Sequence, residues 1–262
     1  KENSFAAFAL GKLYLAGDAA LPRDPAAALK WLTYAAELGN QFAQYRLGKL
    51  LLKGDDGIPK DVIAAIRWLT AAAKQENGYA EYALALVYLT GEDAPKDSVK
   101  ALSLLKRSAG WGNQFAQYRL GKLLLQGEDA PKDVKAAIRW LTAAAEQGNQ
   151  YAQYALGKLY LLGKEVPKDR SSAIKWFQLA ADQGNEYAQY FLEHMDDRLG
   201  QPPVAAVISL FHHLANIFQE QNQPPPSGGV RVAVDRKLLR KIKAKKIAQG
   251  HKADDHEPEM QL

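Results

Sequence analysis

A fourteen-residue stretch, GNQFAQYRLGKLLL, occurs at Gly39–Leu52 and again, without change, at Gly112–Leu125. Related blocks begin at six aromatic residues, which are spaced by 37, 37, 36, 36 and 36 positions: Phe5, Phe42, Tyr79, Phe115, Tyr151 and Tyr187. Self-similarity at this period is the sequence signature of a solenoid, in which each unit stacks only on its neighbours. The chain is therefore interpreted as a repeat array, with its units numbered one to six in chain order.

Each unit contains two segments with helical periodicity, joined by polar turns. In unit two the first segment, Phe42–Lys53, carries small and apolar residues at spacings of three and four. This spacing places them on one helix face, which we expect to be buried: Ala43, Leu47, Leu50 and Leu51. Gly48 lies within the same helix, where glycine costs about 1 kcal/mol relative to alanine. Because glycine recurs there at Gly11, Gly121 and Gly157, we expect a neighbouring helix to approach too closely for a side chain.

The second helix of each unit is expected to begin at an aspartate and to end at a glycine. Pro25 follows Asp24, and proline is favoured at the first helical position, so Asp24 is the predicted N-cap. Alignment predicts the same role for Asp61, Asp97, Asp133 and Asp169. Glycine adopts the left-handed conformation without strain, which predicts helix ends at Gly39, Gly112, Gly148 and Gly184. Tryptophan recurs in this helix, and we expect it to belong to the core between hairpins: Trp31, Trp68, Trp140 and Trp176.

Unit two departs from this pattern at its end. Glu76 stands where the other units have the closing glycine. A non-glycine residue in a left-handed cap is strained, so the sequence predicts either that strain or a different cap. We expect an irregular bend between Gln75 and Gly78.

Unit three departs at more positions. Ala85 replaces the glycine of the first helix, Leu86 replaces the usual lysine, and Leu104 replaces the tryptophan. The unit has its own tryptophan, Trp111, in the turn that ends the second helix. Two interpretations stay open: a local repacking, or a partly exposed Trp111 that belongs to a contact surface.

The recurring motifs resemble those of the Sel1-like repeat family, which are helical solenoids related to tetratricopeptide repeats. The matching marks are LGKLYLAG from Leu10, LGKLLLKG from Leu47 and LGKLYLLG from Leu156, together with PKD and a pattern A-x-x-W-x-x-x-A-A-x-x-G-N that ends at Asn149. The resemblance covers residues 1–196. It implies an all-α fold, a right-handed α/α solenoid of helical hairpins, with units near 5–41, 42–78, 79–114, 115–150 and 151–186 and the start of a sixth at 187.

The sequence changes character after residue 196. Residues 197–222 are predicted to form a capping helix, the second helix of a degenerate sixth unit, and residues 223–262 a linker, a basic helix and an acidic tail. Between Arg231 and Lys252 there are nine lysines or arginines and one acidic residue, Asp235. This helix is expected to pack on the solenoid, to contact nucleic acid or to contact another anionic surface. The tail also resembles the ends of Sel1-repeat-bearing mobilisation relaxases of Gram-positive bacteria, which would connect it with conjugation.

No residues with the spacing of a catalytic or metal centre stand out. The chain has no cysteine, and its five histidines lie at or beyond His194. The segment HKADDHE at His251–Glu257 can be drawn as a metal loop, but a solvated polar tail is the simpler interpretation. We therefore expect no enzyme activity, no metal, no cofactor and no small-molecule substrate. No apolar run is long enough to span a membrane, and the absence of cysteine favours the cytoplasm. KENSF at the start aligns with LGNQF, so the chain is interpreted as a fragment of a longer protein.

The predicted function is binding, because a solenoid of helix pairs offers a concave groove lined by its first helices. We expect a non-catalytic scaffold that binds an extended protein or peptide segment through aromatic and lysine side chains of these helices: Phe8, Lys12, Tyr45, Lys49, Tyr82, Tyr118, Lys122, Tyr154, Lys158 and Tyr190. Alternatively, the tyrosines pack between adjacent first helices and the lysines are solvated. A second hypothesis is an accessory region of a DNA-mobilisation protein whose tail contacts nucleic acid through Arg236, Lys237, Arg240, Lys241, Lys243, Lys245 and Lys246.

Overall fold

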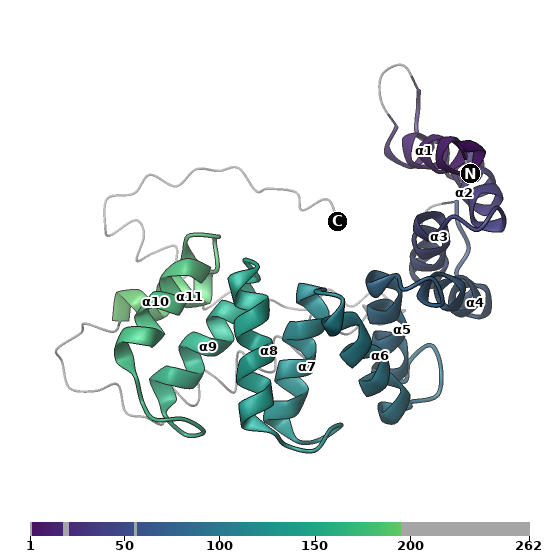
Figure 1. Ribbon diagram of the computed structural model, residues 1–262. Helices are drawn as coiled ribbons and strands as arrows, with labels where there is room; N and C mark the ends of the chain where they lie inside the picture. Colours follow the sequence, from purple (N-terminus) through teal and green to yellow (C-terminus); the bar gives the residue numbers. More distant parts are fainter. Residues whose placement is uncertain (1, 18–20, 55–56, 195–262) are drawn as a thin grey trace, which may run out of the picture. The chain divides into compact units, whose positions relative to one another are not determined.

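A computed structural model describes residues 2–17, 21–54 and 57–194, and this part of the chain contains eleven α-helices and no β-strand (Figure 1). The helices are α1 (Glu2–Ala16), α2 (Pro25–Glu37), α3 (Gln41–Lys53), α4 (Val62–Ala73), α5 (Gly78–Thr90), α6 (Ser98–Gly110), α7 (Gln114–Gln126), α8 (Val134–Glu146), α9 (Gln150–Leu162), α10 (Arg170–Ala181) and α11 (Glu186–His194). Each helix packs against the next one along the chain, and α3 also contacts α5. The predicted all-α solenoid of helical hairpins is confirmed.

Polar caps set the start of both helices in a unit. The Asp24 carboxylate accepts a hydrogen bond of 2.9 Å from the N–H of Ala27, as expected for an N-cap. The same bond, at 2.9 to 3.0 Å, recurs at the other predicted caps: Asp61, Asp97, Asp133 and Asp169. The first helices are capped by asparagines that the sequence analysis did not assign, Asn40, Asn77, Asn113, Asn149 and Asn185. Alternating aspartate and asparagine caps therefore punctuate the array.

The turns that end the second helices have left-handed residues where glycine was predicted. Gly39, Gly112, Gly148 and Gly184 have φ between 83° and 88°. Glu76 takes the same place with φ 63°, and it is the only non-glycine residue with positive φ among the described residues. The N–H of Asn77 still donates to Ala72, as that of Asn40 does to Ala35. The expected irregular bend is therefore wrong: the turn is retained, and the strain falls on Glu76 itself.

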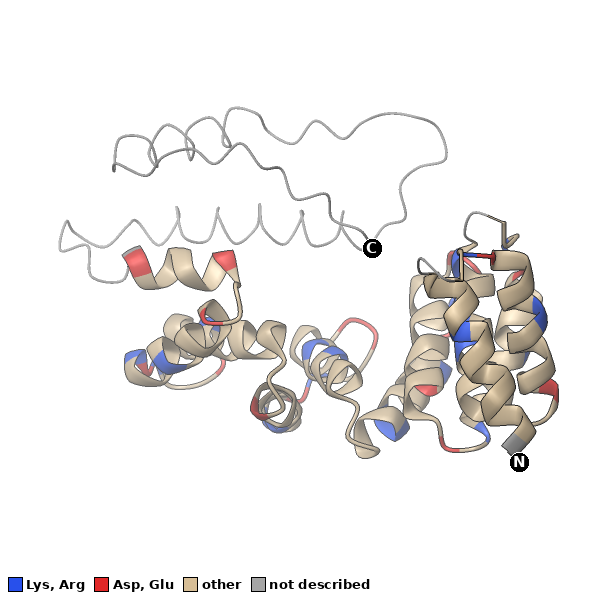
Figure 2. Cartoon of the chain, turned by 90° about the horizontal axis from the view of Figure 1, so that it is seen from above, with Lys and Arg blue, Asp and Glu red and all other residues tan. Residues whose placement is uncertain are grey.

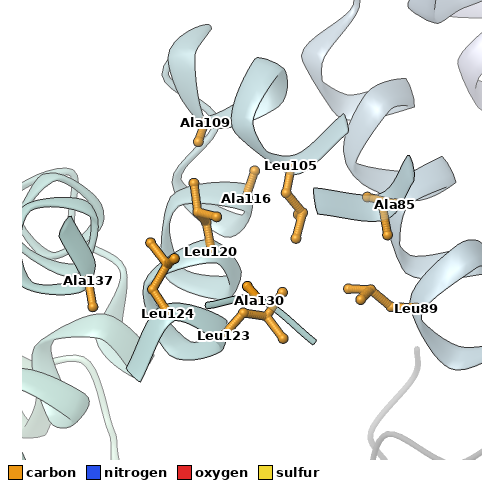
Figure 3. Packing of buried hydrophobic residues seen from close by; sticks show 11 residues of the cluster. Ala85, Leu89, Leu105, Ala109, Ala116, Leu120, Leu123, Leu124, Ala130 and Ala137 are labelled. Atoms are coloured by element: carbon orange, nitrogen blue, oxygen red, sulfur yellow. The ribbon is translucent and has the colours of Figure 1, made fainter. Parts of the chain in front are cut away.

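The core is centred on one side chain of each second helix. These residues are fully buried: Leu32, Leu69, Leu105, Leu141 and Phe177. In unit four a Cβ placed on Gly121 would lie 2.7 Å from Cγ of Leu141, and Gly48 faces Leu69 in the same way. The predicted close approach at the helix glycines is thus confirmed. Figure 3 shows how Leu105 and Leu120 of successive helices converge with the small residue Ala116.

The tryptophans are less buried than predicted. All four repeat tryptophans are only partly buried, and they pack on the edges of the core clusters. The residue after each one, such as Leu141 after Trp140, occupies the centre. Neighbours on a helix point about 100° apart, so only one of the two can point straight into the core. The tryptophans therefore belong to the edge of the core between the hairpins and not to its centre.

The described residues all belong to one compact unit, Lys1–Asp197. Residues 198–262 lie outside the described residues, and so do all of the predicted capping helix at 197–222 and all of 223–262. Those assignments remain predictions. Within the described part, no helix is both long and apolar enough to cross a membrane.

Candidate functional site

A ladder of paired aromatic rings runs along the first helices. We call the ring that opens a first helix the outer ring and the ring three residues later the inner ring. The inner ring of each unit contacts the outer ring of the next, with centroids 5.9 to 6.4 Å apart. The pairs are Phe8–Phe42, Tyr45–Tyr79, Tyr82–Phe115, Tyr118–Tyr151 and Tyr154–Tyr187. This aromatic ladder joins every consecutive pair of units.

Burial separates the two kinds of ring. The inner rings of the first five units are partly buried, and burial raises the pKa of Tyr118 to about 12 and also raises the pKa of Tyr154. The tyrosines thus pack between adjacent first helices, as the alternative interpretation of the sequence held. Tyr190, the inner ring of unit six, is 43% exposed and lies edge-on to Phe191.

The outer rings are the accessible ones. Phe5, Phe42, Tyr79, Phe115 and Tyr151 are 41 to 56% exposed. The sequence analysis used these residues to find the repeat but did not propose them as site residues. Their signal was the recurrence of an aromatic residue two positions after the asparagine that caps each first helix from unit two onward.

The lysines of the predicted site form two groups. Lys12 and Lys49 are exposed, with Nζ 5.8 and 5.9 Å from the centroids of the aromatic rings four residues earlier. Lys122 and Lys158 are partly buried, and burial lowers the pKa of both. Neighbouring positive charge lowers these pKa values further, from Arg119 at Lys122 and from Lys122 at Lys158. Lys122 and Lys158 therefore lie close enough on the first-helix face of units four and five for their positive charges to interact.

Arg119 adds a further positive charge to the first-helix face of unit four. Its Nε is buried and has no hydrogen-bond partner within the described ranges. Burial raises the pKa of the Tyr82 and Tyr118 hydroxyls, and the positive charge of Arg119 offsets part of this rise. Arg119 thus lies among ladder residues of two consecutive units. An incompletely hydrogen-bonded guanidinium and two desolvated lysines favour the approach of an anionic group.

Buried glutamines hold the helices beneath the ladder. In unit four Gln117 donates to the carbonyl of Ala109 at 3.1 Å and accepts from Gln147 at 2.7 Å, so one side chain connects three helices. We call this arrangement the glutamine bridge, and it recurs in units two and five through Gln44 with Gln75 and Gln153 with Gln183. The sequence analysis missed it, because the paired residues are 30 or 31 positions apart.

Unit three has no glutamine bridge. Glu81 replaces the buried glutamine and Trp111 replaces its partner. The Glu81 side chain is fully buried, and Nη2 of Arg107 lies 2.6 Å from its carboxylate, although no donor in the described part is aligned for a hydrogen bond to either oxygen. Burial raises the pKa of Glu81, Arg107 opposes that effect, and Glu76 adds to it. Trp111 is 56% exposed, which supports the interpretation of Trp111 as an accessible residue.

The loops carry a separate ladder of ion pairs. Lys60, Lys96 and Lys132 pair with Asp93, Asp129 and Glu165 of the following loops. Figure 2 shows that lysines and arginines, in blue, and acidic residues, in red, occur both on the helices and on their connections. Such exposed pairs contribute little stability, about 0 to 1 kcal/mol each.

The remaining predicted contacts lie outside the structure. The basic residues proposed for nucleic acid, Arg236, Lys237, Arg240, Lys241, Lys243, Lys245 and Lys246, are beyond the described residues, as is the segment His251–Glu257. Within the described ranges, no cluster of three or more histidine or acidic side chains could hold a metal ion.

Comparison with known proteins identifies the repeat. The family model described as Sel1 repeat matches residues 4–40, 41–77, 78–110, 114–149 and 150–185. The third match ends at Gly110, directly before Trp111. No curated protein sequence matches the chain significantly.

Three solved structures show what the chain is similar to. The protective antigen c5321 of uropathogenic Escherichia coli is 34% identical with a TM-score of 0.67, and the match covers 76% of this chain and 42% of the antigen. A Sel1 repeat protein of Oxalobacter formigenes is also 34% identical, with a TM-score of 0.66 and coverage of 74% and 55%. The chain thus spans about half the length of these two proteins. An immunity protein of Pseudomonas aeruginosa shares the fold at 22% identity, with a TM-score of 0.51 and coverage of 77% and 74%.

Proposed function

Because the chain belongs to the Sel1 repeat family, we propose that it is a protein-interaction scaffold that binds an extended segment of a partner along its first-helix face. Sel1-repeat proteins generally act as scaffolds for protein interactions, and the family is typically non-catalytic. In solenoids the first helices line the concave surface, which is where an extended segment is best enclosed.

One observation carries the proposal: an exposed outer ring lies at four of the five junctions between the units, at Phe42, Tyr79, Phe115 and Tyr151. The rings recur with the repeat, so they offer apolar contacts at regular intervals along the array. Aromatic side chains supply large contact area at low cost in conformational entropy, which suits a binding surface. The rings are already held by their inner partners, so little ordering is needed when a ligand binds.

The positive charge on this face indicates that the expected partner also carries carboxylates. Lys122, Lys158 and Arg119 lie on the same face as the ladder in units four and five. A segment with apolar residues at intervals and carboxylates between them would complement both features. The proposed site therefore comprises the predicted residues of the ladder together with the outer rings Phe42, Tyr79, Phe115 and Tyr151.

Selection from a library of random displayed peptides tests this function. We expect enrichment of peptides with aromatic or aliphatic residues separated by aspartate or glutamate. The double change Lys122→Glu and Lys158→Glu should weaken the selected peptides by at least about tenfold, or about 1.4 kcal/mol. A second variant, Phe115→Ala with Tyr151→Ala, should weaken them by a similar factor.

A matched control distinguishes the effect of the two site lysines from the effect of a change in net charge. Lys30→Glu with Lys135→Glu makes the same change in net charge on exposed positions of the second helices, and peptide binding should be unchanged. Equal binding of the selected peptides to the Lys122→Glu, Lys158→Glu protein and the parent would exclude the first-helix face as the binding surface.

A further inference from the structure

A pocket of about 220 Å³ lies at the junction of units two and three, between the second helices α4 and α6, and residues of α5 also line it. Its apolar lining includes Ala73, Leu84 and Leu104, and the side chain of Tyr88 lines it as well. Leu84 and Tyr88 are two and six residues from the inner ring Tyr82, which puts them on a different side of α5. The pocket is therefore separate from the aromatic ladder.

The pocket exists because a tryptophan is missing. Leu104 occupies the position at which the other units have Trp31, Trp68, Trp140 and Trp176. In unit four Trp140 packs against the core cluster formed by its own unit and the preceding one. Leucine has a much smaller side chain, and the space that an indole would fill is left open at this junction.

Three cationic side chains line the same pocket: Lys74, Lys100 and Arg107. None has a cationic counterpart in another unit. The residues aligned with Lys74 are Glu37, Gly110, Glu146 and Asp182. Those aligned with Lys100 are Ala27, Ala64, Ala136 and Ser172, and those aligned with Arg107 are Tyr34, Ala71, Ala143 and Leu179. Four departures from the repeat pattern, three of charge and one of volume, thus converge on one pocket.

The local charges leave the pocket positive. Lys100 donates a hydrogen bond of 2.8 Å to the Tyr88 hydroxyl, and its Nζ lies 4.0 Å from the centroid of that ring. Arg107 lies beside the buried carboxylate of Glu81. No acidic side chain among the described residues lines the pocket. Even with Glu81 counted as fully ionised, two of the three positive charges are not balanced there.

We propose that this pocket binds a small amphipathic carboxylate, that is, a carboxylate attached to a short aliphatic or aromatic body. The apolar body lies against Leu84 and Leu104, and the carboxylate accepts hydrogen bonds from Lys74, Lys100 and Arg107. Drug-sized ligands occupy pockets of about 300 to 1,000 Å³, so this site takes a smaller molecule or the carboxylate end of a larger one. The proposal is independent of binding at the first-helix face.

Titration of the intact chain with phenylacetate, followed by NMR, tests the proposal. We expect saturable binding with a Kd of about 1 mM, as is usual for a ligand of this size. Phenylacetamide, which has the same shape without the charge, should bind at least about tenfold more weakly. A short peptide that ends in phenylalanine, compared with its amidated form, tells whether a chain end binds better than the free acid.

Residues at the aligned positions of the other units provide the variants that test the pocket. Leu104→Trp restores the residue of the other units and should abolish binding while the protein stays folded. Lys100→Ala, which installs the residue of units two and four, should weaken binding about tenfold. Lys135→Ala removes an exposed lysine of α8 and should leave binding unchanged.

Three outcomes would overturn the proposal. The first is that phenylacetate gives no saturable change in the parent. The second is that it binds Leu104→Trp as well as the parent. The third is that inorganic phosphate competes fully while phenylacetamide binds as tightly as phenylacetate, because the ligand would then not need both charge and an apolar body. None of these results bears on peptide binding at the aromatic ladder.

Discussion

Units three and four are neighbours with the same backbone plan and the same loop, GEDAPKD, yet they differ at several positions around the core centre. Unit four has the glutamine bridge, the helix glycine, the ladder lysine and the edge tryptophan: Gln117, Gly121, Lys122 and Trp140. Unit three has Glu81, Ala85, Leu86 and Leu104 at these positions. Both retain the fully buried leucine of the second helix, Leu105 or Leu141.

The comparison shows which residues specify the fold and which are free to change. A repeat packs as long as one large side chain and a few alanines fill its centre. Residues at the edges of the core can then take on local roles. Unit three departs furthest from the repeat pattern. Its changes give a buried carboxylate, an exposed tryptophan and, together with Lys74 of unit two, a cationic pocket.

The largest effect is expected from the core centre of unit four. Leu141→Ala removes a fully buried side chain and should reduce the free energy of unfolding by about 3 to 4 kcal/mol. Trp140→Ala removes a larger but only partly buried side chain and should cost less, about 2 kcal/mol. Denaturation by urea, monitored by circular dichroism, measures both. A larger loss for Trp140→Ala than for Leu141→Ala would reverse the assignment of the core centre.

The next effect comes from giving unit four the carboxylate of unit three. Gln117→Glu places a buried carboxylate opposite Ala143, where unit three has Arg107. We expect a loss of about 3 kcal/mol at pH 7, because the charge is desolvated without a cation and the bond to the Ala109 carbonyl is lost. Adding Ala143→Arg should recover part of this loss. No recovery in the double variant would show that Arg107 does not stabilise Glu81.

The same comparison predicts a pH dependence in the parent. Burial raises the pKa of Glu81 above its ordinary value, so the folded state binds this proton more tightly than the unfolded state does. Its contribution to stability is complete below the ordinary glutamate range and is lost as the pH rises through the raised pKa. Glu81→Gln should therefore stabilise the protein at pH 7, by about 1 kcal/mol, and less so near pH 4. Equal effects of Glu81→Gln at both pH values would contradict a raised pKa.

A smaller effect is expected at the strained turn of unit two. Glu76→Gly should raise the free energy of unfolding by about 1 kcal/mol, because glycine adopts φ 63° without the steric cost of a side chain. The reverse change in unit four, Gly148→Ala at φ 88°, should cost about the same amount. A destabilised Glu76→Gly protein would mean that the glutamate side chain contributes more than its backbone strain costs.

Much of the fold could be predicted from the sequence because the same motifs recur at the same spacing in several units. The period, the aspartate caps, the glycine turns and the close approach at Gly48 and Gly121 all follow from local chemistry. The choice between Trp140 and Leu141 as core centre did not, because adjacent residues have the same hydrophobic pattern and only the helix orientation separates them.

The candidate site was harder to predict because its contacts join residues of different units. The sequence placed the inner rings on one face, but their partners are the outer rings of the next unit, more than thirty positions away. The glutamine bridge and the pocket likewise depend on contacts between units. The pocket was the least predictable feature, because it arises from a missing side chain at Leu104 rather than from a motif.

The smallest effect on stability, and the sharpest optical contrast, is expected at Trp111. Its side chain is 56% exposed, whereas Trp31, Trp68, Trp140 and Trp176 are partly buried. Iodide should therefore quench Trp111 most efficiently, aided by Arg107 one helical turn earlier, and Trp111→Phe should lower the quenchable fraction with little change in stability. Trp140→Phe is the matched control and should lower it much less. Acrylamide, which is uncharged, separates exposure from charge: Trp111 should remain the most accessible tryptophan, but by a smaller margin. If Trp111→Phe and the parent were quenched to the same extent by both reagents, Trp111 would not be accessible, and unit three would differ from unit four by internal repacking alone.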